Sequence, residues 1–329
     1  MSPQSIDGVH RLNPLDNLQS VLVTGANGPA GYSLVQQLRE RGLHVIATDI
    51  VSGPVEDIAD VFVTGLRADN LELIPFLLQL CRDENLGIDL FIPTVQDELL
   101  TVATAAPLFP CPVLISPVSA VALAHDKFLT AEYAALRDLP IPATLSATVD
   151  SSLWEKHVGF PLVAKPRVSR GGRGVQVLDS AEALESADFS ASSEDIVQAF
   201  APGAEYCPQL YRSPLTHEIS TVVLAKTKLK SGRVGNAAEV VRVDPAESAE
   251  AAEVASIAQE IMSAFGLYGA VDMDIRLMPD RQPVLLEINA RFGANSANTP
   301  EMINAVLEDV EHGAFAPFAF HSMAKAGLR

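Results

Sequence analysis

Cysteine is scarce in this sequence, which has three cysteines among 329 residues. Cys81, Cys111 and Cys207 are too few and too widely spaced for a disulfide framework or a zinc site, so the pattern favours a reducing, cytoplasmic location. Long hydrophobic runs are also lacking, because no segment approaches the roughly 20 apolar residues that cross a bilayer. The polar residues 1–18 lack the apolar core of a signal peptide. We therefore expect neither a membrane protein nor a membrane partner.

Basic residues are few as well, with 23 Lys and Arg against 41 Asp and Glu and a formal net charge of -18. Non-specific binding of DNA or RNA needs clustered positive charge, so we expect no nucleic-acid partner. The hydrophobic fraction of 48% is sufficient for a full core. The length predicts two or three compact domains.

The first third of the chain alternates between predicted strands and helices. Residues 20–50 contain an apolar strand, a glycine turn, an amphipathic helix and a second strand that ends at Asp49. A further helix is predicted near residues 71–81, with strands at 89–93 and 110–116. This alternation predicts a parallel sheet covered by helices on both faces.

The rest of the chain has a different pattern, in which mainly antiparallel strands are predicted. They are expected at residues 160–166, 195–200, 218–225, 269–277 and 283–289. Helices are predicted at residues 127–136 and along the acidic, alanine-rich residues 245–265. The predicted fold class is therefore α/β followed by α+β.

The first glycine loop, from Gly25 to Gly31, lies between a strand and a helix, where backbone N–H groups and a positive helix end attract an anion. Asp49 stands where a dinucleotide-binding fold places its ribose-binding acid. An NAD(P)-dependent reductase or epimerase is thus one interpretation, although none of the five tyrosines is followed by Lys four residues later, as in the short-chain class. The other interpretation is that the glycines only permit tight packing of strand and helix.

The second glycine loop follows the apolar strand that ends near Lys165, and it joins two strands. Its glycines would let backbone amides close over phosphate oxygens, with Arg170 and Arg173 adding positive charge. Lys165 is costly to bury unless it meets an anion. The alternative is a surface hairpin with a basic tip.

Acidic and amide side chains recur at every second residue of two predicted strands. Asp272 and Asp274 share one strand face, and Glu287, Asn289 and Arg291 share another. Pairing of the strands would bring Asp274, Glu287 and Asn289 together as oxygen ligands for Mg²⁺. The alternative is a polar strand face that only meets solvent.

These motifs resemble the ATP-grasp superfamily, most closely the synthetase units of the carbamoyl phosphate synthetase large chain, and also its stand-alone carboxylate-amine ligases. The resemblance covers residues 20–311. It is carried by the order and spacing of DLFIPTVQDEL at 89–99, AHDKFLT at 124–130, VAKPRVSRGGRGV at 163–175, DIVQAFAPGAEY at 195–206, GAVDMDI at 269–275 and LLEINARF at 285–292.

The resemblance implies five segments along the chain. A polar tail at residues 1–18 precedes a Rossmann-like pre-ATP-grasp domain at 19–116. A two-lobed ATP-grasp fold follows, with a small lobe carrying the glycine flap at 117–195 and a large lobe carrying the metal site at 196–311. Residues 312–329 form a C-terminal tail.

Roles for individual residues follow from the same resemblance. ATP would be bound by Lys127, Lys165, Gly171, Gly172, Arg173, Gly174, Gln198, Phe200 and Glu205. Asp274, Glu287 and Asn289 would hold Mg²⁺, or Mn²⁺ in its place. Lys165 and Arg291 are the expected catalytic residues. Two positions depart from the family pattern. The family often has Glu at the position of Gln198, and it commonly has Gln or Glu at the position of Asp274.

The implied reaction is an ATP-dependent ligation of a carboxylate and an amine through an acylphosphate, with release of ADP and phosphate. The expected partners are an amino acid or other small carboxylic acid and an amine, and a homodimer is the default assembly. Acceptor contacts are expected from Gly28, Asn295, Ser296 and Asn298, although the last three also fit an ordinary turn and helix cap. A non-catalytic ATP-binding sensor or scaffold is a further alternative, beside the NAD(P)-dependent enzyme.

Overall fold

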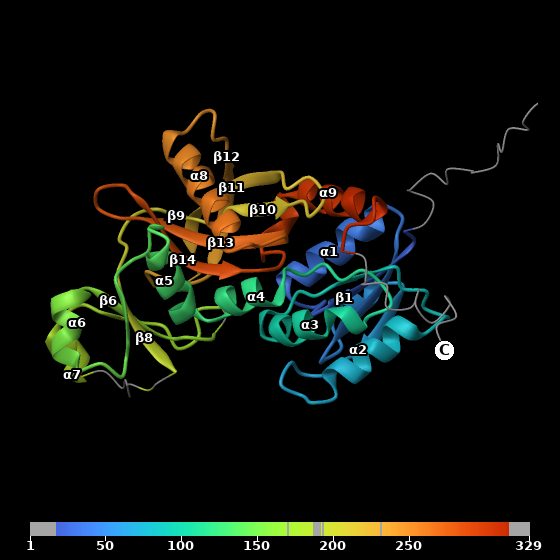
Figure 1. Cartoon of the computed structure of the whole chain (residues 1–329), viewed down its shortest axis with the longest axis horizontal. Helices are drawn as coiled ribbons and strands as arrows, with labels where there is room; N and C mark the ends of the chain where they lie inside the picture. The colour runs from blue at the N-terminus through green and yellow to red at the C-terminus, as the bar shows by residue number, and fades with distance from the viewer. Residues whose placement is uncertain (1–17, 170, 187–191, 193, 231, 316–329) are drawn as a thin grey trace, which may run out of the picture.

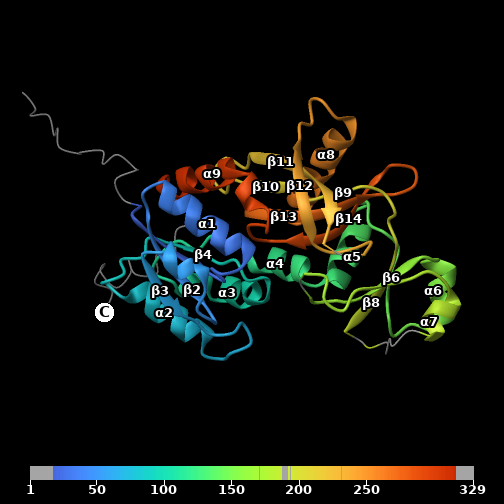
Figure 2. The same cartoon turned by 180° about the vertical axis from the view of Figure 1, so that it is seen from behind.

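The structure of the protein is a computed structural model that describes residues 18–169, 171–186, 192, 194–230 and 232–315. Its strands form three sheets. Figure 1 shows the N-terminal sheet at one end in blue and cyan, a small green lobe at the other end, and a larger sheet in yellow to red between them. The view from behind in Figure 2 shows the same separation of the two ends. Among the described residues, no helix combines the length and apolar character that a membrane crossing requires.

The N-terminal sheet is entirely parallel, with the strand order β3-β2-β1-β4. Its strands are β1 (Ser20–Thr24), β2 (His44–Asp49), β3 (Val61–Thr64) and β4 (Leu90–Ile92), and its helices are α1 (Pro29–Glu40), α2 (Leu73–Arg82) and α3 (Leu99–Ala105). Val21 and Val23 pack in one core cluster with α1, whereas Leu22 packs in another with α2 and α3. Because alternate residues of β1 enter different cores, both faces of the sheet are buried. The predicted parallel sheet is confirmed.

The strand predicted at residues 110–116 is wrong. The described residues there form only an isolated parallel bridge between Val113 and Phe91. Leu114 donates its N–H to the Phe91 carbonyl oxygen at 2.9 Å, but Pro110 and Pro112 have no N–H to extend the ladder. Proline therefore limits this segment to one bridge with β4, which consists of two backbone hydrogen bonds.

The large sheet has the order β10-β11-β9-β13-β14, with β12 paired to β11. Its strands are β9 (Glu205–Tyr206), β10 (Gln209–Arg212), β11 (Ile219–Leu229), β12 (Ala237–Val243), β13 (Gly269–Leu277) and β14 (Pro283–Asn289), covered by α8 (Ala249–Ala264) and α9 (Pro300–Glu311). Val271 and Met273 of β13 pack with α8, while Ala270 packs on the opposite face with α9. Asp272 and Asp274 continue that opposite face, so one side of β13 passes from core to charged surface.

The small sheet has the order β5-β8-β6-β7 and is antiparallel. Its strands are β5 (Thr144–Ser146), β6 (Leu162–Pro166), β7 (Gln176–Leu178) and β8 (Asp195–Ala199), with helices α6 (Ser151–His157) and α7 (Ala181–Ser186). Leu162 and Ala164 pack in a core with Trp154 of α6, so Val163 and Lys165 face the other way. The predicted hairpin around the second glycine loop is confirmed by the pairing of β6 and β7.

Helices α4 (Val118–His125) and α5 (Lys127–Leu136) link the N-terminal sheet to the two antiparallel ones. The single-turn helices are η2 (Pro54–Asp57), η3 (Gln96–Glu98), η4 (Ala106–Leu108) and η5 (Ser296–Asn298). The predicted fold class, a parallel α/β part followed by antiparallel α+β parts, is confirmed. The domain boundaries stay a prediction, and the one between residues 195 and 196 falls within β8, which pairs in the small sheet.

Candidate functional site

The candidate site is a cleft between the small sheet and the large sheet. A cavity of about 250 Å³ lies between the two inner faces. The small sheet contributes Val163, Lys165 and Gln198, and the large sheet contributes its charged strand residues. Six of the 23 basic residues gather at this cavity, namely Lys127, Lys165, Lys226, Lys230, Arg276 and Arg291. Four acidic residues, Glu205, Asp272, Asp274 and Glu287, line the same cavity, so the cleft has a small excess of positive charge in a protein with a net charge of -18.

Lys165 places an ammonium group in the cleft without a carboxylate partner. Its Nζ donates to Gln198 Oε1 at 2.8 Å, and Gln198 Nε2 in turn donates to Thr144 Oγ1 at 2.9 Å. Lys165 is only 7% exposed, and it forms no ion pair within the described residues. Burial, followed by the charge of Lys127, lowers the pKa of Lys165 to about 8. A buried cation held by a neutral amide is a site for an anionic ligand.

Lys127 reaches the same cleft from the first turn of α5. Its Nζ lies 3.1 Å from Glu287 Oε1 and donates to the Ser169 carbonyl oxygen at 3.0 Å. The helix start is fixed because the Asp126 side chain accepts from Phe128 N and also pairs with Arg167. The cap therefore orients the lysine that follows it toward the cleft.

The three predicted metal ligands lie on one strand pair. Asp274 is the cross-strand partner of Glu287, and Asp272 is the partner of Asn289. A register shift follows Asp274, so Leu286 and Glu287 both line the cavity although they are consecutive. The alternation read from the sequence therefore places these oxygen-bearing side chains together.

Lys226 is a site residue that the sequence interpretation missed. Its Nζ contacts Glu205 and lies 2.7 Å from Asp274 Oδ1, while Arg276 Nη2 lies 2.8 Å from Glu205 Oε2. Burial alone would lower the pKa of Lys226, but the charges of Asp274 and Glu205 outweigh it and raise the pKa. Both oxygens of Glu205, which the resemblance predicts to bind ATP, therefore already have cationic partners.

Arg291 leaves the end of β14 and lies between the cleft and the N-terminal sheet. Its Nη1 lies 3.4 Å from Asp272 Oδ2 and donates to the Phe292 carbonyl oxygen at 2.9 Å, and its Nη2 donates to Asn289 Oδ1 at 3.1 Å. Burial, with the charge of Asp274 next, raises the pKa of Asp272 to about 6. The guanidinium is thus held in place by one side chain from each strand of the pair and by the Phe292 carbonyl oxygen just beyond β14.

The predicted flap glycines lie at the mouth of the cleft. Gly171 and Gly172 line the cavity with φ of 65° and 73°, in the left-handed region that favours glycine. A Cβ at Gly174 would lie 2.8 Å from Pro166 Cγ, so this glycine permits close packing on β6. Arg173 lines a different cavity, and Arg170 lies outside the described residues.

The four predicted acceptor contacts are separated in the structure. Asn295 lines the cleft, whereas Gly28 lines a second cavity of about 800 Å³ beside the N-terminal sheet. Ser296 is 1% exposed, and its carbonyl oxygen accepts from Gln37 at 3.3 Å. Asn298 is exposed and donates to the Asn295 carbonyl oxygen at 3.3 Å. Their substrate roles stay predictions.

Comparison with known proteins gives the cleft a context. A family model described as an ATP-grasp domain matches residues 124–295, just over half of the chain. The matched range includes Lys127, Lys165 and the strand pair that carries Asp274 and Glu287. The cleft built from the two antiparallel sheets is therefore the part of the molecule that the family model describes.

Solved structures share the fold at low sequence identity. N5-carboxyaminoimidazole ribonucleotide synthetase from Thermotoga maritima is similar with a TM-score of 0.61 and 18% identity, over 83% of this chain and 68% of that chain. L-amino acid ligase from Bacillus licheniformis is similar with a TM-score of 0.66 and 16% identity, over 84% of this chain and 68% of that chain. These likenesses concern the fold.

A curated relative matches a shorter stretch. Uncharacterized protein MG011 of Mycoplasma genitalium is 32% identical over 89 residues, which are 26% of this chain and 29% of that protein. The match thus spans less than a third of the relative's length.

Proposed function

The chain belongs to the ATP-grasp family, and from this premise we propose that it is an ATP-dependent ligase joining a small carboxylic acid to an amine, with ADP and phosphate as products. The observation that carries the proposal is Lys165, a buried ammonium group that faces the cleft and has only a neutral hydrogen-bond partner. A polyphosphate supplies the anion that this group lacks. The resemblance of the fold to named ligases supports the reaction class by analogy.

The nucleotide would lie between the two sheets. Its phosphates would meet Lys127 and Lys165, with the amides of Gly171 and Gly172 above them, and its base would lie along the end of β8 near Gln198 and Phe200. The cavity of about 250 Å³ is below the roughly 300–1,000 Å³ usual for small-molecule sites. We therefore expect the small lobe and the flap to open when the nucleotide enters.

The strand pair fits a divalent cation by its donor chemistry. Mg²⁺ in phosphate-binding sites takes one or two carboxylates and shares the remaining positions with phosphates and water. Asp274 and Glu287 supply two carboxylates, and Asn289 supplies an amide oxygen on the same face. The described residues contain no cluster of three His, Cys, Asp or Glu side chains that could hold a metal ion. Binding of the cation at the strand pair would therefore depend on phosphate oxygens as further ligands. The cation, Mg²⁺ or Mn²⁺, would neutralise phosphate charge there.

The first step would be attack of a substrate carboxylate oxygen on the γ-phosphorus of ATP, which breaks the bond to ADP and gives an acylphosphate. Lys127 and Lys165 would hold the transferred group, and Arg291 would stabilise its charge from the side of the N-terminal sheet. Amine attack on the acyl carbon would then release phosphate, and the nitrogen would lose a proton. The flap would exclude the water that otherwise hydrolyses the acylphosphate.

The proposal is tested by phosphate release from Mg-ATP against pooled amino acids and metabolite acids, with and without added amines. We expect release that depends on an acid, and its loss in Lys165→Ala and Glu287→Ala variants that keep the wild-type melting temperature. Absence of ADP formation with every pool would contradict the ligase function. Tight Mg-ATP binding without any product would instead identify a nucleotide sensor.

A further inference from the structure

Each of the four carboxylates that line the nucleotide cleft lies beside a cationic side chain. The pairs are Asp272 with Arg291, Asp274 with Lys226, Glu287 with Lys127, and Glu205 with both Lys226 and Arg276. Among the described residues, the cleft therefore offers a metal ion no carboxylate without a neighbouring positive charge. Yet Asp274 and Glu287 are the carboxylates expected to hold Mg²⁺ together with the nucleotide.

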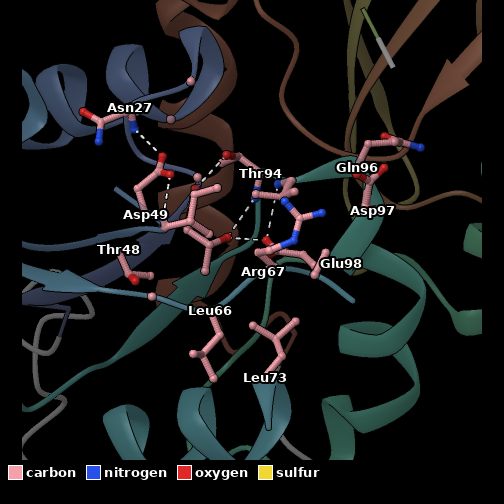
Figure 3. A pocket seen from close by; sticks show the side chains of 18 of the residues that line it. Asn27, Thr48, Asp49, Leu66, Arg67, Leu73, Thr94, Gln96, Asp97 and Glu98 are labelled. Atoms are coloured by element: carbon pink, nitrogen blue, oxygen red, sulfur yellow. Dashed lines mark hydrogen bonds between the residues drawn. The ribbon is translucent and has the colours of Figure 1, made fainter. Parts of the chain in front are cut away.

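Asp49 in the second cavity shows that an acid beside a cavity of this protein does not need a cation. Figure 3 shows Asp49 next to Asn27, whose backbone N–H donates to Asp49 Oδ2 at 2.9 Å. Its Oδ1 accepts from Ile50 N at 2.7 Å, and within the described residues it forms no ion pair. Pairing of all four cleft carboxylates is thus not required to hold an acid beside a cavity, so it points to a role within the cleft.

Lys226 is the member of this network that two carboxylates share. Its Nζ contacts Glu205 and lies 2.7 Å from Asp274 Oδ1, and its side chain is only 6% exposed. Glu205 also has Arg276, whereas Lys226 is the cationic partner of Asp274 within the described residues. Asp274 is 24% exposed and lines the cavity. One expected metal ligand therefore meets both the open cleft and a buried ammonium group.

The ammonium group and a metal ion would compete for Asp274. A divalent cation bound to this carboxylate would lie close to Lys226 Nζ, and like charges repel more strongly in a partly buried site than in water. Nucleotide phosphates would change this balance because they bring negative charge. An ammonium group has three N–H donors, and two acceptors are found among the described residues, so one N–H remains for a phosphate oxygen.

Resting on the nucleotide site of the ligase function above, we propose that Lys226 is a positioning residue that keeps a divalent cation from binding between Asp274 and Glu287 until a nucleotide is present. In the free protein its ammonium group supplies the positive charge that the carboxylates of Glu205 and Asp274 require. When the nucleotide binds, a phosphate oxygen accepts a hydrogen bond from Lys226, and the phosphates balance the charge of the incoming cation. The cation then enters with the nucleotide and leaves with ADP.

The test measures binding of Mn²⁺ alone, without nucleotide or substrate, from the electron paramagnetic resonance signal of the free ion. Lys226→Met is compared with wild type, with Lys226→Arg, which keeps the charge, and with Lys228→Met, a matched change at an exposed lysine of the same strand. We expect Lys226→Met to bind Mn²⁺ about tenfold or more tightly than wild type, because the repelling charge is gone. Lys226→Arg and Lys228→Met should bind Mn²⁺ as weakly as wild type.

A double variant assigns the gained affinity to this site. Lys226→Met combined with Asp274→Asn removes both charges of the ion pair and should abolish the gain. A gain that persists in the double variant would overturn the inference, as would equal binding of Mn²⁺ by Lys226→Met and wild type. A purely structural ion pair predicts that Lys226→Met loses stability without gaining affinity for Mn²⁺.

Wild type keeps the inference falsifiable if the melting temperature shows that Lys226→Met does not fold. Binding of Mn²⁺ to nucleotide-free wild type that Glu287→Gln weakens by about tenfold or more would show a metal already at the strand pair, and it would overturn the inference. Titration calorimetry of wild type with Mn-ADP separates the two proposals. If Mn-ADP does not bind, the proposed function fails first. If Mn-ADP binds and Lys226→Met gains no affinity for Mn²⁺, this inference fails alone.

Discussion

Asp274 and Glu287 face each other across strands β13 and β14, and each carboxylate contacts the ammonium group of a different lysine. Lys226 Nζ lies 2.7 Å from Asp274, and Lys127 Nζ lies 3.1 Å from Glu287. The two acids therefore form the centre of a charge network. Its lysines come from two other elements, because Lys127 begins α5 and Lys226 lies on β11. Cations delivered with a nucleotide would enter this network between the carboxylates.

Replacement of Glu287 by Gln should reduce acid-dependent ADP formation by roughly 10²–10³-fold, the loss seen when one preorganised electrostatic group is removed from a site. The amide keeps the shape of the side chain but removes a charge that Lys127 contacts and that a bound divalent cation would also contact. Steady-state assays over a range of Mg²⁺ concentrations measure the loss. Glu239→Gln, at an exposed position of β12, is the matched control and should behave as wild type.

The affinity for ATP should fall as the pH rises above about 8, because burial lowers the pKa of Lys165 to about 8 in the free protein. Lys165 is charged below that pH and attracts phosphate, and it is neutral above it, so the dissociation constant should rise by up to about tenfold per pH unit. Titrations with Mg-ATP between pH 7 and pH 9.5 measure the change. Lys165→Arg, which stays protonated, should give a flat profile over this range. A flat profile for wild type would contradict the role of Lys165.

Replacement of Lys226 by Met should destabilise the protein by about 3 kcal/mol, at the lower end of the range for breaking a buried ion pair. Lys226 is the only cation shown within ion-pair distance of Asp274 in the described residues, whereas Glu205 would keep Arg276. Chemical denaturation at neutral pH measures the loss. Lys228→Met, two residues along the same strand at an exposed position, should change stability by less than about 0.5 kcal/mol. Equal effects of the two variants would remove Lys226 from the network.

Replacement of Gly172 by Ala tests the flap. Its φ of 73° costs an alanine about 1–2 kcal/mol, while a Cβ would meet only Gly235 Cα at 3.5 Å, an ordinary contact. Gly87→Ala is the matched control, because Gly87 has φ of 54° and open space around its Cβ position far from the cleft. Both variants should lose similar stability, but only Gly172→Ala should raise the KM for ATP several-fold. Unchanged kinetics in Gly172→Ala would leave the loop without a role in nucleotide binding.

Much of the fold followed from short-range patterns. Alternation along residues 269–277 and 283–289 predicted both strands and the common face of Asp274 and Glu287, since a strand repeats every two residues. The hairpin at the second glycine loop was predicted from the same kind of pattern. The strand expected at 110–116 failed because two prolines remove the N–H groups that a ladder needs.

The missed site residues depend on tertiary placement. Lys226 and Lys228 have the same spacing as the exposed face of any amphipathic strand, and only the pairing of β11 with β9 brings Lys226 to Glu205. Ser296 was predicted as an acceptor contact from its place after the strand that carries Glu287, and the structure buries it against α1. Sequence patterns thus located the strands, whereas the charge network required the fold.

Trapping of the acylphosphate distinguishes a carboxylate-amine ligase from any other ATP-consuming enzyme. Wild-type protein is incubated with Mg-ATP, pooled amino acids and hydroxylamine, and ADP and acyl hydroxamate are quantified together, with Lys165→Met as the inactive control. We expect equal amounts of ADP and hydroxamate from wild type and neither product from Lys165→Met. ADP formed without hydroxamate, or no ADP with any acid, would contradict it.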